Sequence, residues 1–296
     1  MKLAVNYSTL ALDLLSDGQI QIDYFKCPAW PDLIAKVQTI HPTYIHFPLR
    51  VGRGIGDAID TETKQSADWS KVELLLARTD TTLINLHLAP TIQDYPNIPF
   101  DTVDTANIEM LTENMVKDVR TVARRFGSER IIVENDHDSG NRHLLPAFLP
   151  EVIHDVVEET DCGFLLDLSH ARLASHRLGV NVREYISALP TSHIREIHIT
   201  GIQRIEGHWI EQMHQVGIDA STIQFYTGRL VDHLPMTADD WEFFTWSIEQ
   251  VHSGLWAKPW VVTFEYGGVG LLYEAVTEIG ALADQIPRLH KLVKGT

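Results

Sequence analysis

The feature that most constrains the fold of this chain is the alternation of short apolar runs with longer amphipathic segments. The short runs are rich in β-branched residues, and the segments between them repeat apolar residues with helical periodicity. Near-continuous apolar strands separated by helices are typical of a parallel sheet that is covered on both faces. The predicted strands are KLAVNYS, TYIHFPL, TTLINLHLAP, RIIVEND, GFLLDLSHA, REIHITG and WVVTFEYGG.

The spacing of these strands predicts one more. The interval between Ile197 and Val262 is about twice the interval between other neighbouring strands. GRLVDHLPM lies within this interval and precedes a capping-box pattern, Thr237 to Asp240, that predicts the start of a helix. We therefore expect GRLVDHL to be the seventh of eight strands. The predicted helices cover residues 31–40, 68–78, 106–126, 144–159, 182–189, 238–252 and 271–292.

Eight strand–helix units in 296 residues predict a single-domain (β/α)8 TIM barrel with eight parallel strands. The long segment around residues 202–228 is expected to be an insertion over the mouth of the barrel. A doubly wound open sheet is the alternative fold. It is disfavoured because no glycine-rich phosphate-binding loop follows the first strand.

Composition narrows the range of partners. The net charge of −16 and the lack of a basic cluster disfavour nucleic acids and anionic membranes. Cys27 and Cys162 are the only cysteines, so no disulfide framework is expected. Asn6 and Asp13 interrupt the apolar N-terminus, which is unlike a signal peptide, and no segment has the length of a membrane span. We expect a cytoplasmic protein.

The candidate functional residues lie at the strand ends, because the active sites of such barrels lie at the carboxyl ends of the strands. A lone His or Glu at a strand end more often has a structural role, but six coincident metal-ligand types are difficult to explain in that way. A buried carboxylate such as Glu134 is costly unless a charge such as that of a metal ion compensates it. The six candidate ligands are His46, His87, Glu134, Asp167, His198 and Glu265.

Further candidates lie close to these residues. The pattern is equally consistent with metal binding and with a structural role for His170, His176, Asp232 and His233. Asn135 is expected to orient Glu134 or to contact a substrate. His208 and His214 are expected to be surface residues. Mixed carboxylate and imidazole ligands suit iron, manganese, zinc or cobalt, and six ligands exceed the needs of one four-coordinate ion, which favours two or more metals.

The order Glu134, Asp167, His198, Glu265 resembles the metal-binding set of the xylose isomerase-like barrel superfamily. That superfamily includes sugar isomerases and epimerases, an endonuclease branch and a branch of iron oxidases. Within it, the chain most closely resembles the multinuclear non-haem iron-dependent oxidative enzymes. The motifs that carry this resemblance are PTYIHFPLRVGRG, NLHLAP, VEND, LLDLSHA, EIHITG and TFEYGG.

The resemblance implies an oxidoreductase that binds two or more irons and modifies cysteines in ribosomally made peptides, often with a partner protein that presents the peptide. His46, His87, Glu134 and Asn135 would then be catalytic. An alternative is a manganese- or zinc-dependent sugar isomerase or epimerase, which would act on a small molecule and use His46 to move a proton. A second alternative is a catalytically inactive binding scaffold.

Overall fold

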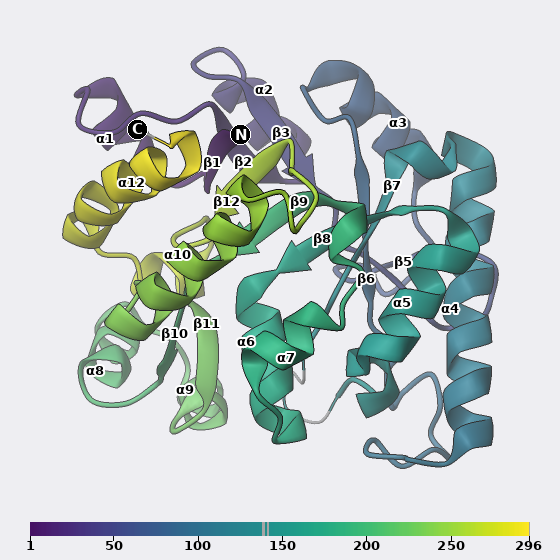
Figure 1. Ribbon diagram of the computed structural model, residues 1–296. Coiled ribbons are helices and arrows are strands. Elements are labelled where there is room, and N and C mark those ends of the chain that lie inside the picture. The colour runs from purple at the N-terminus through teal and green to yellow at the C-terminus, as the bar shows by residue number, and fades with distance from the viewer. Residues whose placement is uncertain (138–139, 141, 296) are drawn as a thin grey trace.

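A ten-stranded sheet forms the centre of the computed structural model, which describes residues 1–137, 140 and 142–295 (Figure 1). The strand order is β3-β2-β1-β12-β9-β8-β7-β6-β4-β5, and its neighbours are parallel except for β4 and β5. The strands are β1 Lys2–Asn6, β2 Tyr24–Pro28, β3 Thr43–His46, β4 Leu49–Val51, β5 Ile59–Asp60, β6 Ile84–Leu88, β7 Ile131–Glu134, β8 Gly163–Asp167, β9 Ile194–Ile199 and β12 Val261–Phe264.

The sheet closes into a ring because β3, at one end, is continuous in the chain with β4, which lies next to the short β5 at the other end. Only Phe47 and Pro48 separate β3 from β4. Strand β3 pairs with β2, and β4 pairs with β6. With β3 and β4 counted as one strand, the described part of the chain forms a ring of eight parallel strands. The predicted (β/α)8 barrel is therefore confirmed.

The prediction of the seventh strand was wrong. GRLVDHL contains β11 (Leu230–Leu234), which pairs antiparallel with β10 (Gly201–Arg204) in a separate two-stranded sheet. Strand β9 pairs directly with β12 instead. The strand that completes the ring is β2, whose short sequence YFKCP includes a lysine and a proline and so lacks the apolar run used to predict strands.

Helices surround the ring, and most of the predicted ones are present (Figure 1). The predicted helix at 271–292 is divided in two, and α6 begins directly after β8. No helix of the described residues is both long and apolar enough to cross a membrane. The helices are α1 Thr9–Ser16, α2 Pro31–Val37, α3 Trp69–Arg78, α4 Thr105–Phe126, α5 Pro150–Thr160, α6 Leu168–Leu178, α7 Val182–Ser187, α8 His208–Gln215, α9 Ala220–Tyr226, α10 Ala238–His252, α11 Leu271–Ala275 and α12 Ile279–Lys294, with 3-10 turns η1 Ser128–Arg130, η2 Leu145–Phe148 and η3 Thr191–His193.

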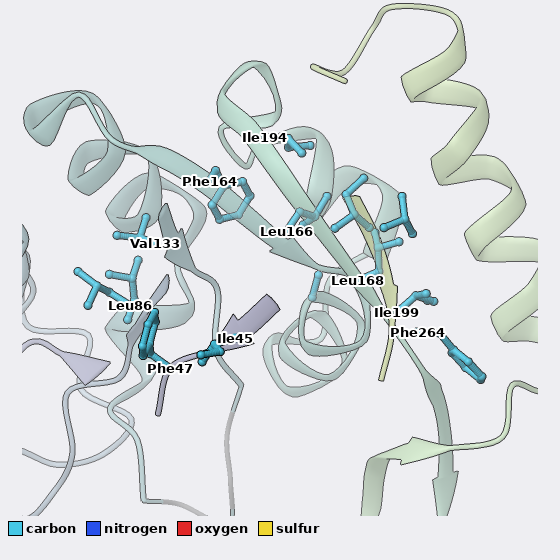
Figure 2. Packing of buried hydrophobic residues seen from close by; sticks show 14 of the residues in the cluster. Ile45, Phe47, Leu86, Val133, Phe164, Leu166, Leu168, Ile194, Ile199 and Phe264 are labelled. Carbon is cyan, nitrogen blue, oxygen red and sulfur yellow. The ribbon is translucent and has the colours of Figure 1, made fainter. Parts of the chain in front are cut away.

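Alternate strand residues face opposite sides of the barrel wall. One set packs against the helices in a single hydrophobic cluster, which includes Ile45, Leu86, Val133, Leu166 and Phe264 (Figure 2). The other set faces the barrel interior and is largely polar. It contains Lys26, Tyr44, His46, His87, Glu134, Asp167, Glu196, His198 and Thr263. The alternation thus places the apolar residues in the core and the ionisable residues inside the barrel.

The segment around residues 202–228 lies beside the barrel rather than in its wall (Figure 1). Helices α8 and α9 connect β10 to β11, and their buried residues form a second hydrophobic cluster around Trp209, Met213 and Ile223. The two strands pack closely, since a Cβ added at Gly201 would lie 2.0 Å from the carbonyl oxygen of Pro235. This close packing fixes the position of β11 and of the polar residues that it carries.

Candidate metal centre

The polar residues at the carboxyl ends of the strands meet in one cluster. Among the described residues, four triads each offer three potential ligand atoms that lie within 4.8 Å of one another. Neighbouring triads share a member, so the cluster is a series of overlapping candidate sites and not a single isolated one. The triads are His46–Glu134–His198, Glu134–Asp167–His170, Asp167–His198–Glu265 and Asp136–His137–His170.

Glu134, the last residue of β7, lies in the middle of this series and is 1% exposed. Its Oε2 lies 3.4 Å from both His46 Nε2 and His87 Nδ1. Its Oε1 lies 3.7 Å from His170 Nδ1 and 3.9 Å from His198 Nδ1. Burial raises the pKa of Glu134 well above its usual range. Each oxygen of this carboxylate therefore faces a different pair of histidines.

Asp167 joins the cluster at the point where β8 ends and α6 begins. Its Oδ1 accepts hydrogen bonds from the backbone N–H groups of Ser169 and His170, at 2.7 and 2.8 Å, and so caps the helix. Its other oxygen, Oδ2, lies 3.7 Å from His170 Nε2. The Asn135 amide donates to the carbonyl of Asp167 and accepts from its N–H, both at 2.9 Å. Asn135 therefore positions the backbone of Asp167, and both polar atoms of its amide are used in this contact.

His46, at the end of β3, and His87, in β6, lie side by side on neighbouring strands of the ring. Their Nε2 atoms are 3.1 Å apart, and Asn85 Nδ2 lies 3.0 Å from His46 Nε2. Burial lowers the pKa of His46 well below its usual value and that of His87 to about 4. Both rings are therefore neutral at pH 7, which is the form of imidazole that binds metals.

His198 and Glu265 form the opposite side of the cluster. His198 Nδ1 lies 2.9 Å from Glu265 Oε1, while its Nε2 lies 2.7 Å from Glu196 Oε1. Glu196 also accepts a hydrogen bond from the Tyr44 hydroxyl at 2.7 Å. Burial lowers the pKa of His198 and raises that of Glu196 to about 7. A neutral ring that donates to Glu196 through Nε2 keeps Nδ1 available as a ligand atom.

Glu196 and Lys26 belong to this site but were not predicted from the sequence. Lys26 forms a buried ion pair with Glu265. Burial lowers the pKa of Lys26 to about 8, against the opposing effect of the surrounding carboxylates. The period of two residues along a strand could have identified both, since it places Glu196 on the face of His198 and Lys26 on the inner face of β2. Lys26 was missed because β2 was missed.

Asp232 reaches the cluster although β11 is not a barrel strand. Its Oδ2 lies 3.2 Å from His170 Nε2. Burial lowers the pKa of His170, but Asp167, Asp232 and Glu134 outweigh this effect and the pKa lies well above its usual value. His233 Nδ1 lies 2.8 Å from the carbonyl oxygen of Glu265, so this ring nitrogen is directed at the backbone.

The structure does not bring every candidate histidine to the cluster. His176 is exposed in the last turn of α6, six residues and almost two helical turns beyond His170. His208 and His214 are exposed on α8. Conversely, Asp136 and His137 follow β7 and form a triad with His170, although they were not selected from the sequence.

Unpaired buried atoms support metal binding. Glu134 Oε2, Asp167 Oδ2 and His198 Nδ1 are buried and make no hydrogen bond to another described residue, although His198 Nδ1 lies close to Glu265. Each such atom costs roughly 1–3 kcal/mol when it has no partner. Two carboxylate oxygens and an imidazole nitrogen in neighbouring triads are donors that divalent transition metals bind. The residues at this site therefore fit a metal centre.

Two cavities open onto the cluster. One has a volume of about 330 Å³ and is lined by Lys26, Trp30 and His46, among other residues. The other has a volume of about 1150 Å³ and extends from the cluster to the insertion, where Phe225 and Arg229 line it. Both are lined by His87, His170, His233 and Tyr273. The metal-ligand candidates are thus accessible to molecules larger than water.

Comparison with known proteins identifies a family that this chain matches. A sequence model described as "RiPP precursor modification enzyme MbnB/TglH/ChrH" matches residues 51–238. The matched segment contains Glu134, Asp167, His198 and Asp232, whereas His46 and Glu265 lie outside it. The cluster therefore extends beyond the matched segment at both ends.

The individual proteins that resemble this chain have low sequence identity to it. The chain is 24% identical to a UPF0276 protein of Acinetobacter baylyi over 154 residues, which are 50% of each protein. It spans half or less of the length of the curated relatives that it matches. Its fold resembles a xylose isomerase domain containing protein of Salmonella typhimurium (TM-score 0.55, 12% identity, 99% and 97% of the two chains). It also resembles the 3-keto-D-glucoside 4-epimerase of E. coli (TM-score 0.55, 13% identity, 98% and 99%).

Proposed function

Because this chain belongs to the family of RiPP precursor modification enzymes MbnB/TglH/ChrH, we propose that it oxidises a cysteine of a ribosomally made peptide at a centre of two or more irons. The observation that carries the proposal is the position of Glu134. Its two oxygens face different histidine pairs, His46 with His87 and His170 with His198. A single-metal isomerase site does not need this arrangement.

The residues would divide between two ions. Asp167, His198 and Glu265 form one triad, and His46 with His87 lies on the other side of the shared Glu134. His170 and Asp232 offer ligand atoms to a further ion. Iron bound here would supply redox chemistry, taking electrons from the substrate thiolate and passing them to dioxygen. A partner protein that presents the peptide is part of this proposal.

The surrounding residues set the charge and the orientation of the site. Lys26 lines the smaller cavity, where its ammonium group compensates the charge of Glu265. Glu196 holds the His198 ring so that Nδ1 stays directed at the cluster. Cys27 also lines this cavity, but burial raises its pKa to about 12, so its own thiol stays protonated and unreactive.

The metal content tests the proposal. The chain would be loaded with ferrous iron without oxygen, and bound iron would be counted in the parent and in the His46→Ala/His87→Ala double variant. The control is His208→Ala/His214→Ala, which removes two exposed histidines of α8. We expect a loss of about one iron per chain in the first variant only.

Turnover separates the proposed function from the alternatives. Synthetic single-cysteine peptides would be exposed to oxygen, and thiol loss would be followed by mass spectrometry. Iron-dependent thiol loss in the parent and the control, but not in the His46→Ala/His87→Ala variant, supports the proposal. An unchanged iron count with isomerisation of sugars would favour an isomerase in which His46 and His87 transfer protons. Absence of bound metal would favour a binding scaffold.

A further inference from the structure

We infer that the larger cavity is a groove that binds an acidic segment of the peptide substrate through Arg142, Arg204 and Arg229. The inference rests on the proposed function and names a chemical property of its substrate. The groove begins at His87 and His170 in the metal centre and ends at the insertion. A segment bound in it would therefore be adjacent in sequence to the residue that reacts.

The three arginines come from different parts of the chain. Arg142 follows β7, Arg204 ends β10 and Arg229 precedes β11. All three are exposed and line the groove. By contrast, Arg50 lines the same groove and is paired with Asp94 at 2.7 Å. Within the described ranges, no carboxylate forms an ion pair with the other three, so their charges are available to a ligand.

These guanidinium groups are already held in place. Those of Arg142 and Arg229 lie 5.0 and 4.1 Å from the centre of the Phe225 ring. Arg204 Nη1 donates a hydrogen bond to the carbonyl oxygen of Gly228 at 2.8 Å. Two cations against one ring repel each other unless an anion lies nearby. Because the side chains are positioned before binding, an anion that joins them loses less conformational entropy on binding.

Charge indicates what kind of anion would bind. The chain carries a net charge of −16, so an extended polyanion such as a nucleic acid would be repelled by most of the surface. A short segment with a few carboxylates needs only the local positive field of the groove. Guanidinium groups bind carboxylates in a bidentate manner, and Asp or Glu side chains near the modified residue would satisfy them.

Peptide binding tests the inference independently of the chemistry. Fluorescein-labelled peptides would carry serine in place of the single cysteine and, on one side of it, a run of Glu, Gln or Lys. Fluorescence anisotropy would measure their affinity for the iron-loaded full chain without oxygen. We expect the Glu peptide to bind at least about tenfold more tightly than the Gln peptide, with the difference decreasing as salt increases.

Two triple variants locate the effect. R142Q/R204Q/R229Q should remove the preference for the Glu peptide. R78Q/R124Q/R195Q should retain it, because this control changes the net charge equally but alters exposed arginines near the opposite end of the barrel. An equal loss in both variants, or equal affinity of the Glu and Gln peptides for the parent, would overturn the inference.

A competitor distinguishes the remaining possibilities. If a single-stranded DNA of similar length displaces the Glu peptide more effectively than unlabelled Glu peptide does, the groove binds nucleic acid and the inference fails. Iron counting and thiol oxidation are measured separately with cysteine peptides. The experiments can therefore disprove the preference for acidic peptides without disproving the proposed oxidation, and they can disprove the oxidation without disproving the preference.

Discussion

Replacement of Asp167 by asparagine and by alanine should separate two roles that this residue combines. Its Oδ1 caps α6 through two backbone N–H groups, whereas the buried Oδ2 makes no hydrogen bond within the described residues. Asp167 also belongs to the triad with His198 and Glu265. Asparagine keeps an oxygen that can cap the helix but loses the charge that a metal ion requires. Alanine loses both functions.

The expected magnitudes follow from these contacts. Without metal, Asp167→Asn should unfold with a free energy within about 0.5 kcal/mol of the parent, and Asp167→Ala should lose about 2 kcal/mol because the cap is buried. With free iron at about one hundred times its dissociation constant, each bound iron should add about 2.7 kcal/mol to the stability of the parent. Both variants should gain less than the parent by at least this amount. Asp68→Ala is the matched control, since Asp68 caps α3 in the same way but lies outside the four triads.

Urea unfolding followed by circular dichroism, without oxygen and with either iron or a chelator, measures all of these values. The Asp68→Ala control should lose about 1 kcal/mol in both states and keep the full iron-dependent gain. If Asp167→Asn gained as much from iron as the parent, Asp167 would not be a ligand. If the two Asp167 variants were equally stable without metal, the capping argument would be refuted.

Three further predictions concern stability. Asp118→Ala should lower the free energy of unfolding in urea by roughly 3 kcal/mol, because the buried carboxylate accepts hydrogen bonds from the N–H groups of residues 52, 54 and 56. An unchanged free energy of unfolding would contradict this. Gly201→Ala should lower the free energy of unfolding by roughly 2 kcal/mol, because the added methyl group collides with Pro235, and it should weaken peptide binding in the groove. If stability and peptide affinity were both unchanged, the close packing would be refuted. Burial raises the pKa of Cys162 to about 11, so the unfolded chain releases this proton first as pH rises; the stability from the protonated thiol is present below about pH 9 and lost between about pH 9 and 11. As pH rises from 8 to 10, the free energy of unfolding should therefore fall by about 1 kcal/mol less in Cys162→Ala than in the parent. Identical pH profiles of the two proteins would disprove the effect.

Local patterns in the sequence were sufficient to predict the barrel and most residues of the cluster. The apolar runs at Ile131 and Phe164 identify buried strands, because a strand covered on both sides has few polar residues before its end. Parallel strands in a barrel have their carboxyl ends on one side, so the sequence alone predicts that Glu134, Asp167 and His198 lie close together.

Only the tertiary structure decided which strands pair and which side chains join the cluster. Apolar periodicity indicates that a residue is buried but not which strand lies beside it, so β11 was assigned to the ring in place of β2. For the same reason Lys26 was missed, and Asp232 reaches His170 through an antiparallel ribbon that the sequence does not predict. His176 lies outside the four triads because the helix that begins at Leu168 carries it away from them, although it lines the larger cavity. Patterns between neighbouring residues determined the elements and their polar ends, whereas contacts between distant segments determined the site.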